Sequence, residues 1–198
     1  MVLGASPTGS GLQILPLMGG LLITSITSGQ LISRTGTYKP FPIAGTAIMV
    51  VGLALLSTMG PHTTRLTASA FMFVLGLGLG LVMQVLVLAV QNAVDYKDLG
   101  VATSGATLFR SIGGSVGTAV LGSIFSNRLS SEVASLIPRS AASSLSGGVA
   151  RLSSSSLKRL PAPIHAAYLT AFTDALSTVF EVAAVVAAFA FVLSWALQ

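Results

Sequence analysis

The strongest constraint on the fold of this chain is a set of five apolar stretches, each long enough to cross a lipid bilayer. They cover approximately residues 12–33, 41–59, 66–92, 101–125 and 166–198. A helix needs about 20 mostly apolar residues to cross the ~30 Å hydrocarbon layer, because it rises ~1.5 Å per residue. Barrel strands are only ~10 residues long and alternate polar with apolar residues, which these stretches do not. The sequence therefore predicts an all-α integral membrane protein with five transmembrane helices.

The composition agrees with a membrane location. Hydrophobic residues make up 53% and charged residues 8% of the 198-residue chain, whereas soluble domains carry about 25% charged residues. This composition excludes an ordinary water-soluble domain. It also excludes a disordered chain, which needs low hydrophobicity and high charge. The chain has no cysteine, so disulfides and thiolate metal sites are excluded as well.

The net charge of +5 does not indicate a nucleic-acid partner. The basic residues are scattered over the predicted loops, and the tyrosines and the tryptophan do not cluster beside them. The expected partner of the positive charge is the lipid bilayer, because loops that flank membrane helices are enriched in Lys and Arg.

Residues 1–125 contain the first four apolar stretches, and short polar links join these stretches. Short links make neighbouring helices antiparallel, so we expect two helical hairpins. Residues 126–165 are rich in Ser, Pro and Gly and are predicted to form a surface loop that leads to the fifth helix. Residues 1–11 show no signal peptide and are predicted to be a loop. This opening resembles the middle of a protein more than its beginning.

Two of the predicted helices each carry a narrow stripe of small and polar residues. At about 100° per residue, the third stretch aligns Gly76, Gly80, Gln84, Val87 and Gln91. The fourth stretch aligns Thr103, Thr107, Arg110, Gly114, Gly117 and Thr118. Lipid cannot satisfy an amide or a guanidinium, so we expect these faces to point into a helix bundle or a hydrated cavity.

The glycines have a simple structural interpretation. The spacings Gly76-xxx-Gly80 and Gly113-xxx-Gly117, with Gly114 beside the second, match the small-xxx-small pattern of closely packed membrane helices. The amides of Gln84, Gln91 and Asn92 fit two interpretations equally: a hydrogen bond to a neighbouring helix, or the wall of a cavity.

Three ionisable residues lie within or near the predicted spans. Arg110 costs about 2.5 to 3.5 kcal/mol near the bilayer centre, so it requires a partner, a hydrated cavity or a route to the interface by snorkelling. Glu181 is the best candidate for a proton carrier, and its alternative is a structural ion pair, for instance with Arg110. Asp174 lies closer to the membrane edge and fits a solvated acid near a helix start.

The chain lacks the features of an enzyme. Residues 113–117 match a G-x-S-x-G string, but they lie inside an apolar helix and not at a strand-to-helix turn. His62 and His165 fall in separate predicted loops without ligands at metal-binding spacing. No clustered acid and base is present. We therefore expect no enzymatic activity, no metal site and no cofactor.

Four segments resemble one family of transporters. They are residues 6–16, residues 29–39, residues 76–94 and residues 100–117. Together they resemble the carboxy-terminal part of a major facilitator superfamily transporter, in the fourteen-helix EmrB/QacA-type branch of multidrug:proton antiporters. The second segment is similar to the superfamily's cytoplasmic loop motif, G-x-L-x-D-R-x-G-R-x-K, with Gly29, Arg34, Gly36 and Lys39 at matching positions.

The loop motif departs from the family pattern at two positions. Ser33 stands in place of the motif's acid and Thr37 in place of its second base, so the gating role that this loop has in the first half of the family is in doubt here. The resemblance implies that the loop is cytoplasmic. The positive-inside rule, applied to all basic residues, favours the reverse orientation. The basic residues on the loop's side are Arg34, Lys39 and Lys97, and those on the other side are Arg65, Arg128, Arg139, Arg151, Lys158 and Arg159.

The resemblance implies a function for the intact protein. Transporters of this superfamily hold substrate at mid-membrane between two repeated halves, and five helices cannot supply both halves. We expect missing amino-terminal helices or a partner chain, a plasma-membrane location, and proton-driven export of small hydrophobic or cationic compounds. Gln84, Gln91, Asn92, Arg110, Glu181 and Asp174 are the candidate cavity residues. The alternative is a membrane protein without transport activity, either a truncated remnant or a helper subunit that packs against partner helices.

Overall fold

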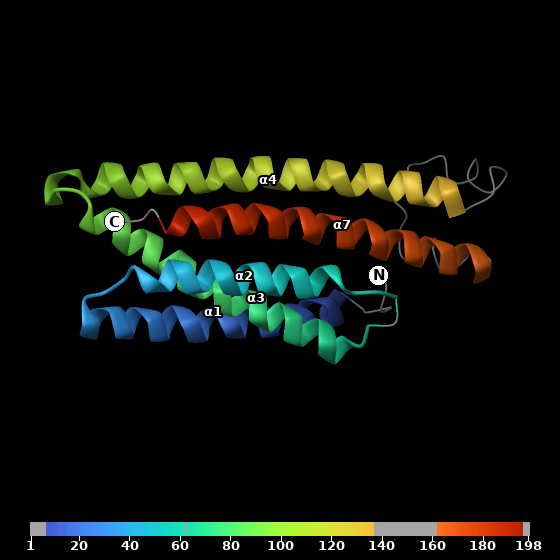
Figure 1. Ribbon diagram of the computed structural model, residues 1–198, viewed down its shortest axis with the longest axis horizontal. Helices are drawn as coiled ribbons and strands as arrows, with labels where there is room; N and C mark the ends of the chain where they lie inside the picture. The colour runs from blue at the N-terminus through green and yellow to red at the C-terminus, as the bar shows by residue number, and fades with distance from the viewer. Residues whose placement is uncertain (1–6, 62, 137–161, 196–198) are drawn as a thin grey trace.

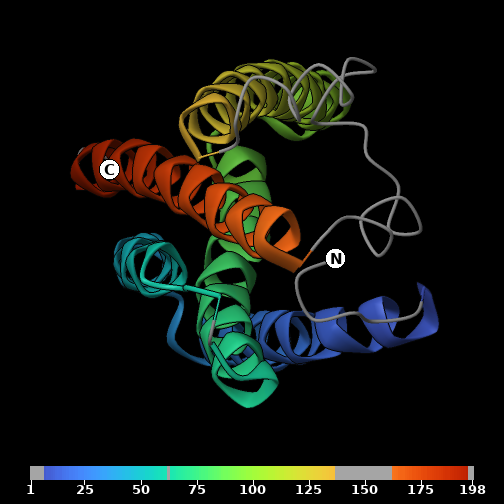
Figure 2. The ribbon, with the colours of Figure 1, turned by 90° about the vertical axis from the view of Figure 1, so that its right-hand side faces the viewer.

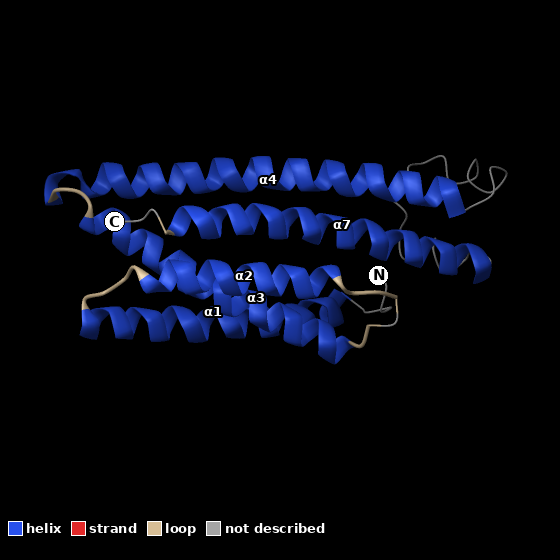
Figure 3. Ribbon diagram, viewed as in Figure 1, coloured by secondary structure: helices blue, strands red, loops and turns tan. Residues whose placement is uncertain are grey.

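The computed structural model describes residues 7–61, 63–136 and 162–195. This part of the chain is helical, without strands, and its five long helices are apolar enough to cross a membrane (Figures 1 and 3). Their bounds are α1 Pro7–Thr35, α2 Pro40–Ser57, α3 Arg65–Asn92, α4 Leu99–Leu136 and α7 Ala162–Ser194, with the short 3-10 helix η1 at Tyr96–Asp98. The predicted all-α membrane fold is confirmed.

Local sequence signals explain where several helices begin and end. Gly36 follows α1 with φ +69° and donates its backbone N–H to the carbonyl of Ile32 at 2.8 Å. This left-handed residue closes the helix, and glycine adopts it without steric cost. Thr64 precedes α3 in an extended conformation, and its hydroxyl accepts the N–H of Thr67 at 3.3 Å. That bond satisfies one of the free donors of the first turn.

The helices do not pack in their order along the chain. Extensive contacts join α1 to α3, α3 to α2, α2 to α7 and α7 to α4, so the spatial order is α1, α3, α2, α7, α4. Figure 2 shows α3 crossing the middle of this arrangement, with α1 at one end and α4 at the other. The bundle thus has two parts, one formed by α1, α3 and α2 and the other by α7 and α4. The contact between α2 and α7 joins them, and α3 also touches α4.

Glycines on two faces of α3 allow these close contacts. A side chain at Gly76 would meet the carbonyl of Leu17 on α1. On the opposite face, a Cβ at Gly78 would lie 2.8 Å from the carbonyl oxygen of Gly45 on α2. Small residues let helix backbones approach where lipid offers no hydrophobic driving force for association. The glycine-rich middle of α3 is thus a packing surface toward two helices.

The structure corrects the predicted loop at residues 126–165. Residues 126–136 continue α4 without a break, so this helix has 38 residues instead of the predicted 25, and residues 162–165 already belong to α7. Leu129 and Val133 are buried against Tyr168, Ala171 and Ala175 of α7. Residues 126–136 therefore do have apolar partners to pack on, contrary to the prediction for this part of the loop. Residues 137–161 and 196–198 lie outside the described residues.

A second, smaller correction concerns the start of the chain. Residues 1–11 are predicted to be a loop, but α1 already begins at Pro7. Proline is compatible with the first turn of a helix, because the N–H that it lacks has no partner there. The remaining predicted spans end within a few residues of the observed helices.

Candidate functional site

A small crevice between α3 and α4 contains the one arginine within the predicted spans. Val87 and Val90 of α3 and Thr103, Thr107 and Arg110 of α4 line it, and its volume is about 20 Å³. That volume is enough for about one water molecule. The Thr107 hydroxyl donates to the carbonyl of Thr103 at 2.9 Å, so it still has lone pairs to offer a guest. Arg110 and the two threonines thus make the α4 side of this notch polar, whereas the two valines make its α3 side apolar.

The predicted stripe on α3 divides into two parts. Gly76 and Gly80 are buried against α1, where a side chain at Gly80 would meet the carbonyl of Leu21 and the hydroxyl of Thr24. Further along the same face, Gln84 is exposed and Val87 lines the crevice beside Arg110. Beyond them Gln91 is exposed as well. The packed part and the open amide part of the stripe thus follow each other on one helix face.

The carboxylates of α7 lie apart from Arg110. Glu181 and Asp174 are both exposed, on a face of α7 that is not part of the core it forms with α4. Thr178 lies between them and donates its hydroxyl to the carbonyl of Asp174 at 3.1 Å. In the described part of the chain, Glu181 and Arg110 are not within ion-pair distance. The structural ion pair considered from the sequence is absent between these two residues.

The glycines of α4 have no packing partner within the described residues. A Cβ built at Gly113, Gly114 or Gly117 would have no heavy atom within 4 Å beyond its own helix. Neighbouring apolar residues on α4, among them Phe109 and Val116, are also exposed. The small-xxx-small interpretation therefore requires a helix other than α1, α2, α3 or α7. Asn92, at the end of α3, is likewise exposed.

The loop between α1 and α2 carries the residues that match the family motif. Arg34 lies in the last turn of α1 and Lys39 immediately precedes α2, and both side chains are exposed. Gly36 makes the turn described above. Ser33, which replaces the motif's acid, donates its hydroxyl back to the carbonyl of Gly29 at 2.9 Å. The acid of the family motif could pair with a basic residue, whereas Ser33 at this position bonds only within its own helix.

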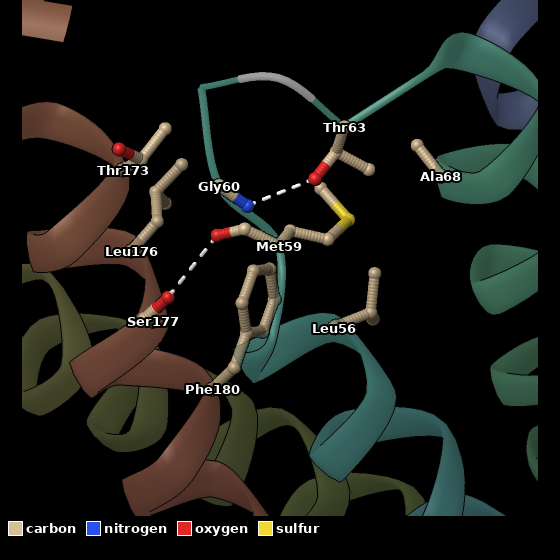
Figure 4. Close-up of a pocket in the computed structure, with 9 residues that line it drawn as sticks. All are labelled: Leu56, Met59, Gly60, Thr63, Ala68, Thr173, Leu176, Ser177 and Phe180. Atoms are coloured by element: carbon tan, nitrogen blue, oxygen red, sulfur yellow. Dashed lines mark hydrogen bonds between the residues drawn. The ribbon is translucent and has the colours of Figure 1, made fainter. Parts of the chain in front are cut away.

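A second cavity, which the sequence does not predict, lies where α2, α3 and α7 meet. Its volume is about 80 Å³ and its walls include Leu56, Met59, Leu176 and Phe180 (Figure 4). At its edge Ser177 donates a hydrogen bond of 3.4 Å to the carbonyl of Met59. Because residues from three helices form this cavity, no pattern within one helix could have indicated it. Among the described residues, no group of His, Asp and Glu side chains could hold a metal ion.

Five bilayer-length helices, glycine-lined contacts between them, and an arginine and amides left on open faces define a multi-pass helical membrane protein. No family model matches the chain, but individual curated proteins do. Over 198 residues, 98% of the chain, it is 44% identical to an uncharacterized MFS-type transporter of Mycobacterium tuberculosis. The chain belongs to the major facilitator superfamily.

Other relatives carry more specific names. The chain is 39% identical to the multidrug transporter protein MdtP of Bacillus subtilis over 127 residues. This aligned region covers 64% of the chain and 23% of MdtP. It is 31% identical over 188 residues to the aspyridones efflux protein of Neocamarosporium betae, covering 94% of the chain and 33% of that protein. The relatives that it matches are thus transporters and not enzymes.

The chain spans only part of the length of these relatives. It covers 28% of the Mycobacterium tuberculosis transporter. This share agrees with the incomplete packing of α4, since relatives of that length have room for further helices. The activity of a whole transporter cannot therefore be assigned to these five helices alone.

Proposed function

We propose that this chain forms one wall of the transport pathway of a multidrug exporter. The observation that supports the proposal most strongly is its similarity to a multidrug transporter and to an efflux protein. In the proposed role, the intact protein resides in the plasma membrane and exports small hydrophobic or cationic compounds in exchange for protons. The proton gradient is its energy source, and no cofactor is required.

The polar notch at the α3–α4 divergence is the proposed contact with substrate and water. Gln84 and Arg110 are exposed on helices that belong to different parts of the bundle. Ionisable and polar groups within membrane spans are costly unless they face a hydrated path or a partner. Val87, on the same α3 face as the exposed amides, lines the crevice together with Arg110, so this face of α3 and the guanidinium of α4 border one opening. Gln91 and Asn92 extend this polar surface toward the end of α3.

Glu181 is the proposed proton-coupling residue. It is an exposed carboxylate in the middle of α7, without an ion-pair partner among the described residues. A carboxylate at that depth can alternate between a charged state in a hydrated cavity and a neutral state in a closed one. Asp174, two turns away on the same face, lies nearer the start of α7 and is proposed to help hydrate the path.

The experiment is proton-driven dye efflux from everted vesicles that contain the full-length protein, encoded with its upstream sequence. We compare Glu181→Gln and Arg110→Ala with the parent. The matched controls are Glu132→Gln and Arg128→Ala, which change the same residue types in a partly exposed i,i+4 pair at 3.3 Å on the extension of α4. We expect both site variants to lose at least about tenfold in rate and both controls to retain it, because removal of a functional ionisable group removes its step.

Two outcomes would contradict the proposal. If Glu181→Gln and Arg110→Ala export dye at the parent rate, the residue assignments are wrong. If the full-length parent itself shows no proton-driven efflux while it inserts normally, the alternative of a membrane protein without transport activity replaces the transporter. The unpacked glycine face of α4 is compatible with both candidates, because a helper subunit would also need a partner helix there.

A further inference from the structure

A groove of the described residues lies at the other end of the α2–α3–α7 junction from the cavity in Figure 4. Pro42 and Thr46 of α2, Leu86 of α3, and Ala190, Leu193 and Ser194 of α7 line it, and its volume is about 250 Å³. An apolar cavity of about 150 Å³ is large enough to bind benzene. The groove can therefore hold several carbons of a hydrocarbon chain.

The side chains that line the groove offer an occupant no free hydrogen-bond donor. The buried hydroxyl of Thr46 donates to the carbonyl of Pro42 at 2.7 Å. The buried hydroxyl of Ser194 donates to the carbonyl of Phe191 at 2.6 Å. Within the described residues, no buried side-chain N or O atom lacks a partner. A guest that accepts hydrogen bonds, such as a phosphate or a carboxylate, would lose its bonds with water and find no side-chain donor in the groove, so the lining favours a hydrocarbon chain.

The position of the groove along the helices places it just beneath a lipid headgroup layer. Helix α2 has 18 residues and is therefore about 27 Å long, close to the thickness of the hydrocarbon layer. Its first residue lies at the membrane surface, and Thr46 lies about 9 Å below it. The end of α7 lies at the same end of the molecule as the α1–α2 connection (Figure 1). A chain held in the groove would thus carry its headgroup beside that connection.

The surface above the groove is cationic and aromatic. Lys39 directly precedes α2, is exposed, and has no ion-pair partner among the described residues. Trp195 follows Ser194 and packs edge-on against Phe191, with ring centroids 6.3 Å apart. Tryptophan is enriched at the membrane interface, and a lysine there attracts anionic lipid. Lys97 is another exposed lysine, but Asp95 lies 3.7 Å from it and offsets its charge.

We propose that this groove binds one acyl chain of an anionic phospholipid whose phosphate lies beside Lys39. Charge complementarity selects the headgroup, and the hydroxyl groups already bonded to backbone select the chain. The proposal is independent of the proposed transport function, because it needs neither substrate nor a proton gradient. It gives Lys39, one of the two basic residues retained in the loop motif, a ligand outside the polypeptide.

The only tryptophan of the chain provides the measurement. Trp195 fluorescence is recorded in phosphatidylcholine vesicles that contain brominated phosphatidylglycerol or brominated phosphatidylcholine at equal mole fraction and with identical acyl chains. We expect phosphatidylglycerol to associate about fivefold more tightly, the preference that one lysine near the surface gives. The Lys39→Gln variant should lower this preference to about one, and the control Lys97→Gln should retain it.

A second pair of variants tests the groove itself. Ala190→Phe fills it and should reduce quenching by both brominated lipids, whereas Ala54→Phe, an equal change at an exposed position of α2, should not. Far-UV circular dichroism checks that each variant keeps its helices. Equal quenching of the parent by the two lipids overturns the proposal, and so does a preference that survives Lys39→Gln. A preference that disappears in the full-length protein, with Trp195 as its single tryptophan, also overturns it, because another helix then covers the groove.

Discussion

The hydroxyl of Ser177 on α7 donates a hydrogen bond of 3.4 Å to the carbonyl oxygen of Met59, 118 positions earlier in the chain. Met59 follows the last turn of α2, where carbonyl groups have no partner within the helix. The bond joins the end of one hairpin to the carboxy-terminal helix at the edge of the cavity in Figure 4. The bond is a direct contact between the end of α2 and α7.

We predict that Ser177→Ala lowers the free energy of unfolding by about 0.6 kcal/mol or less, the average for hydrogen bonds between membrane helices. The bond is long, and the Met59 carbonyl can turn to water at the membrane edge. Unfolding in mixtures of sodium dodecyl sulfate and mild detergent, followed by circular dichroism, measures this change. The control is Ser104→Ala, whose hydroxyl bonds only within α4. A loss above about 2 kcal/mol would show that Ser177 contributes more than this bond.

Tyr168 should determine whether the extension of α4 stays attached to α7. Its side chain is 2% exposed and contacts the cluster that contains Leu129 and Val133. Replacing a buried aromatic residue with alanine costs about 3 to 5 kcal/mol in soluble cores. We expect Tyr168→Ala to speed amide hydrogen exchange across residues 126–136. Tyr96→Ala, at a 91% exposed position, should leave that exchange unchanged; if both variants behave alike, the cluster does not hold the extension.

Two glycines, one on the small-residue stripe of α3 and one on that of α4, should respond differently to valine. In the 198-residue chain, Gly76→Val forces a side chain against the carbonyl of Leu17 and should cost about 1 to 3 kcal/mol, as overpacking does. Gly114→Val meets no atom within 4 Å and should not destabilise this chain. The same detergent unfolding assay compares the two. A Gly114→Val variant as unstable as Gly76→Val would mean that α4 packs on this chain in a way that the structure lacks.

The same pair of variants in the full-length protein tests what covers α4. There we expect Gly114→Val to lower thermal stability as well, because the open glycine face should then meet a helix from the rest of the protein. The measurement is the midpoint of thermal aggregation of the purified protein in detergent. A full-length protein indifferent to Gly114→Val would show that this face contacts lipid or water instead.

Alanine should have opposite effects at two glycines of the loop motif. Gly36 has φ +69°, a conformation that costs an L-residue about 1 to 2 kcal/mol, so Gly36→Ala should destabilise the chain. Gly29 is helical with no neighbouring atom within 4 Å, so Gly29→Ala should stabilise the chain by up to about 1 kcal/mol. Unfolding midpoints of the two variants against the parent give both signs. A stabilising Gly36→Ala would contradict the turn assigned to this loop.

Most of the five spans can be predicted from the sequence, because bilayer length and apolar content are properties of a continuous segment. The stripe from Gly76 to Gln91 is visible for the same reason, since a helix repeats about every 3.6 residues. The end of α4 could not be predicted in this way. Its last turns look polar along the sequence, and they are helical because Leu129 and Val133 meet Tyr168 on another helix.

The sequence by itself determined that this protein is a membrane-embedded set of helices and which residues share a helix face. Only the tertiary structure decided that α3 lies between α1 and α2, that Gly76 is packed while Gly114 is open, and that Arg110 and Glu181 stay apart. The physical reason is that lipid is as apolar as the helices themselves, so which helices pair depends on close packing between distant segments.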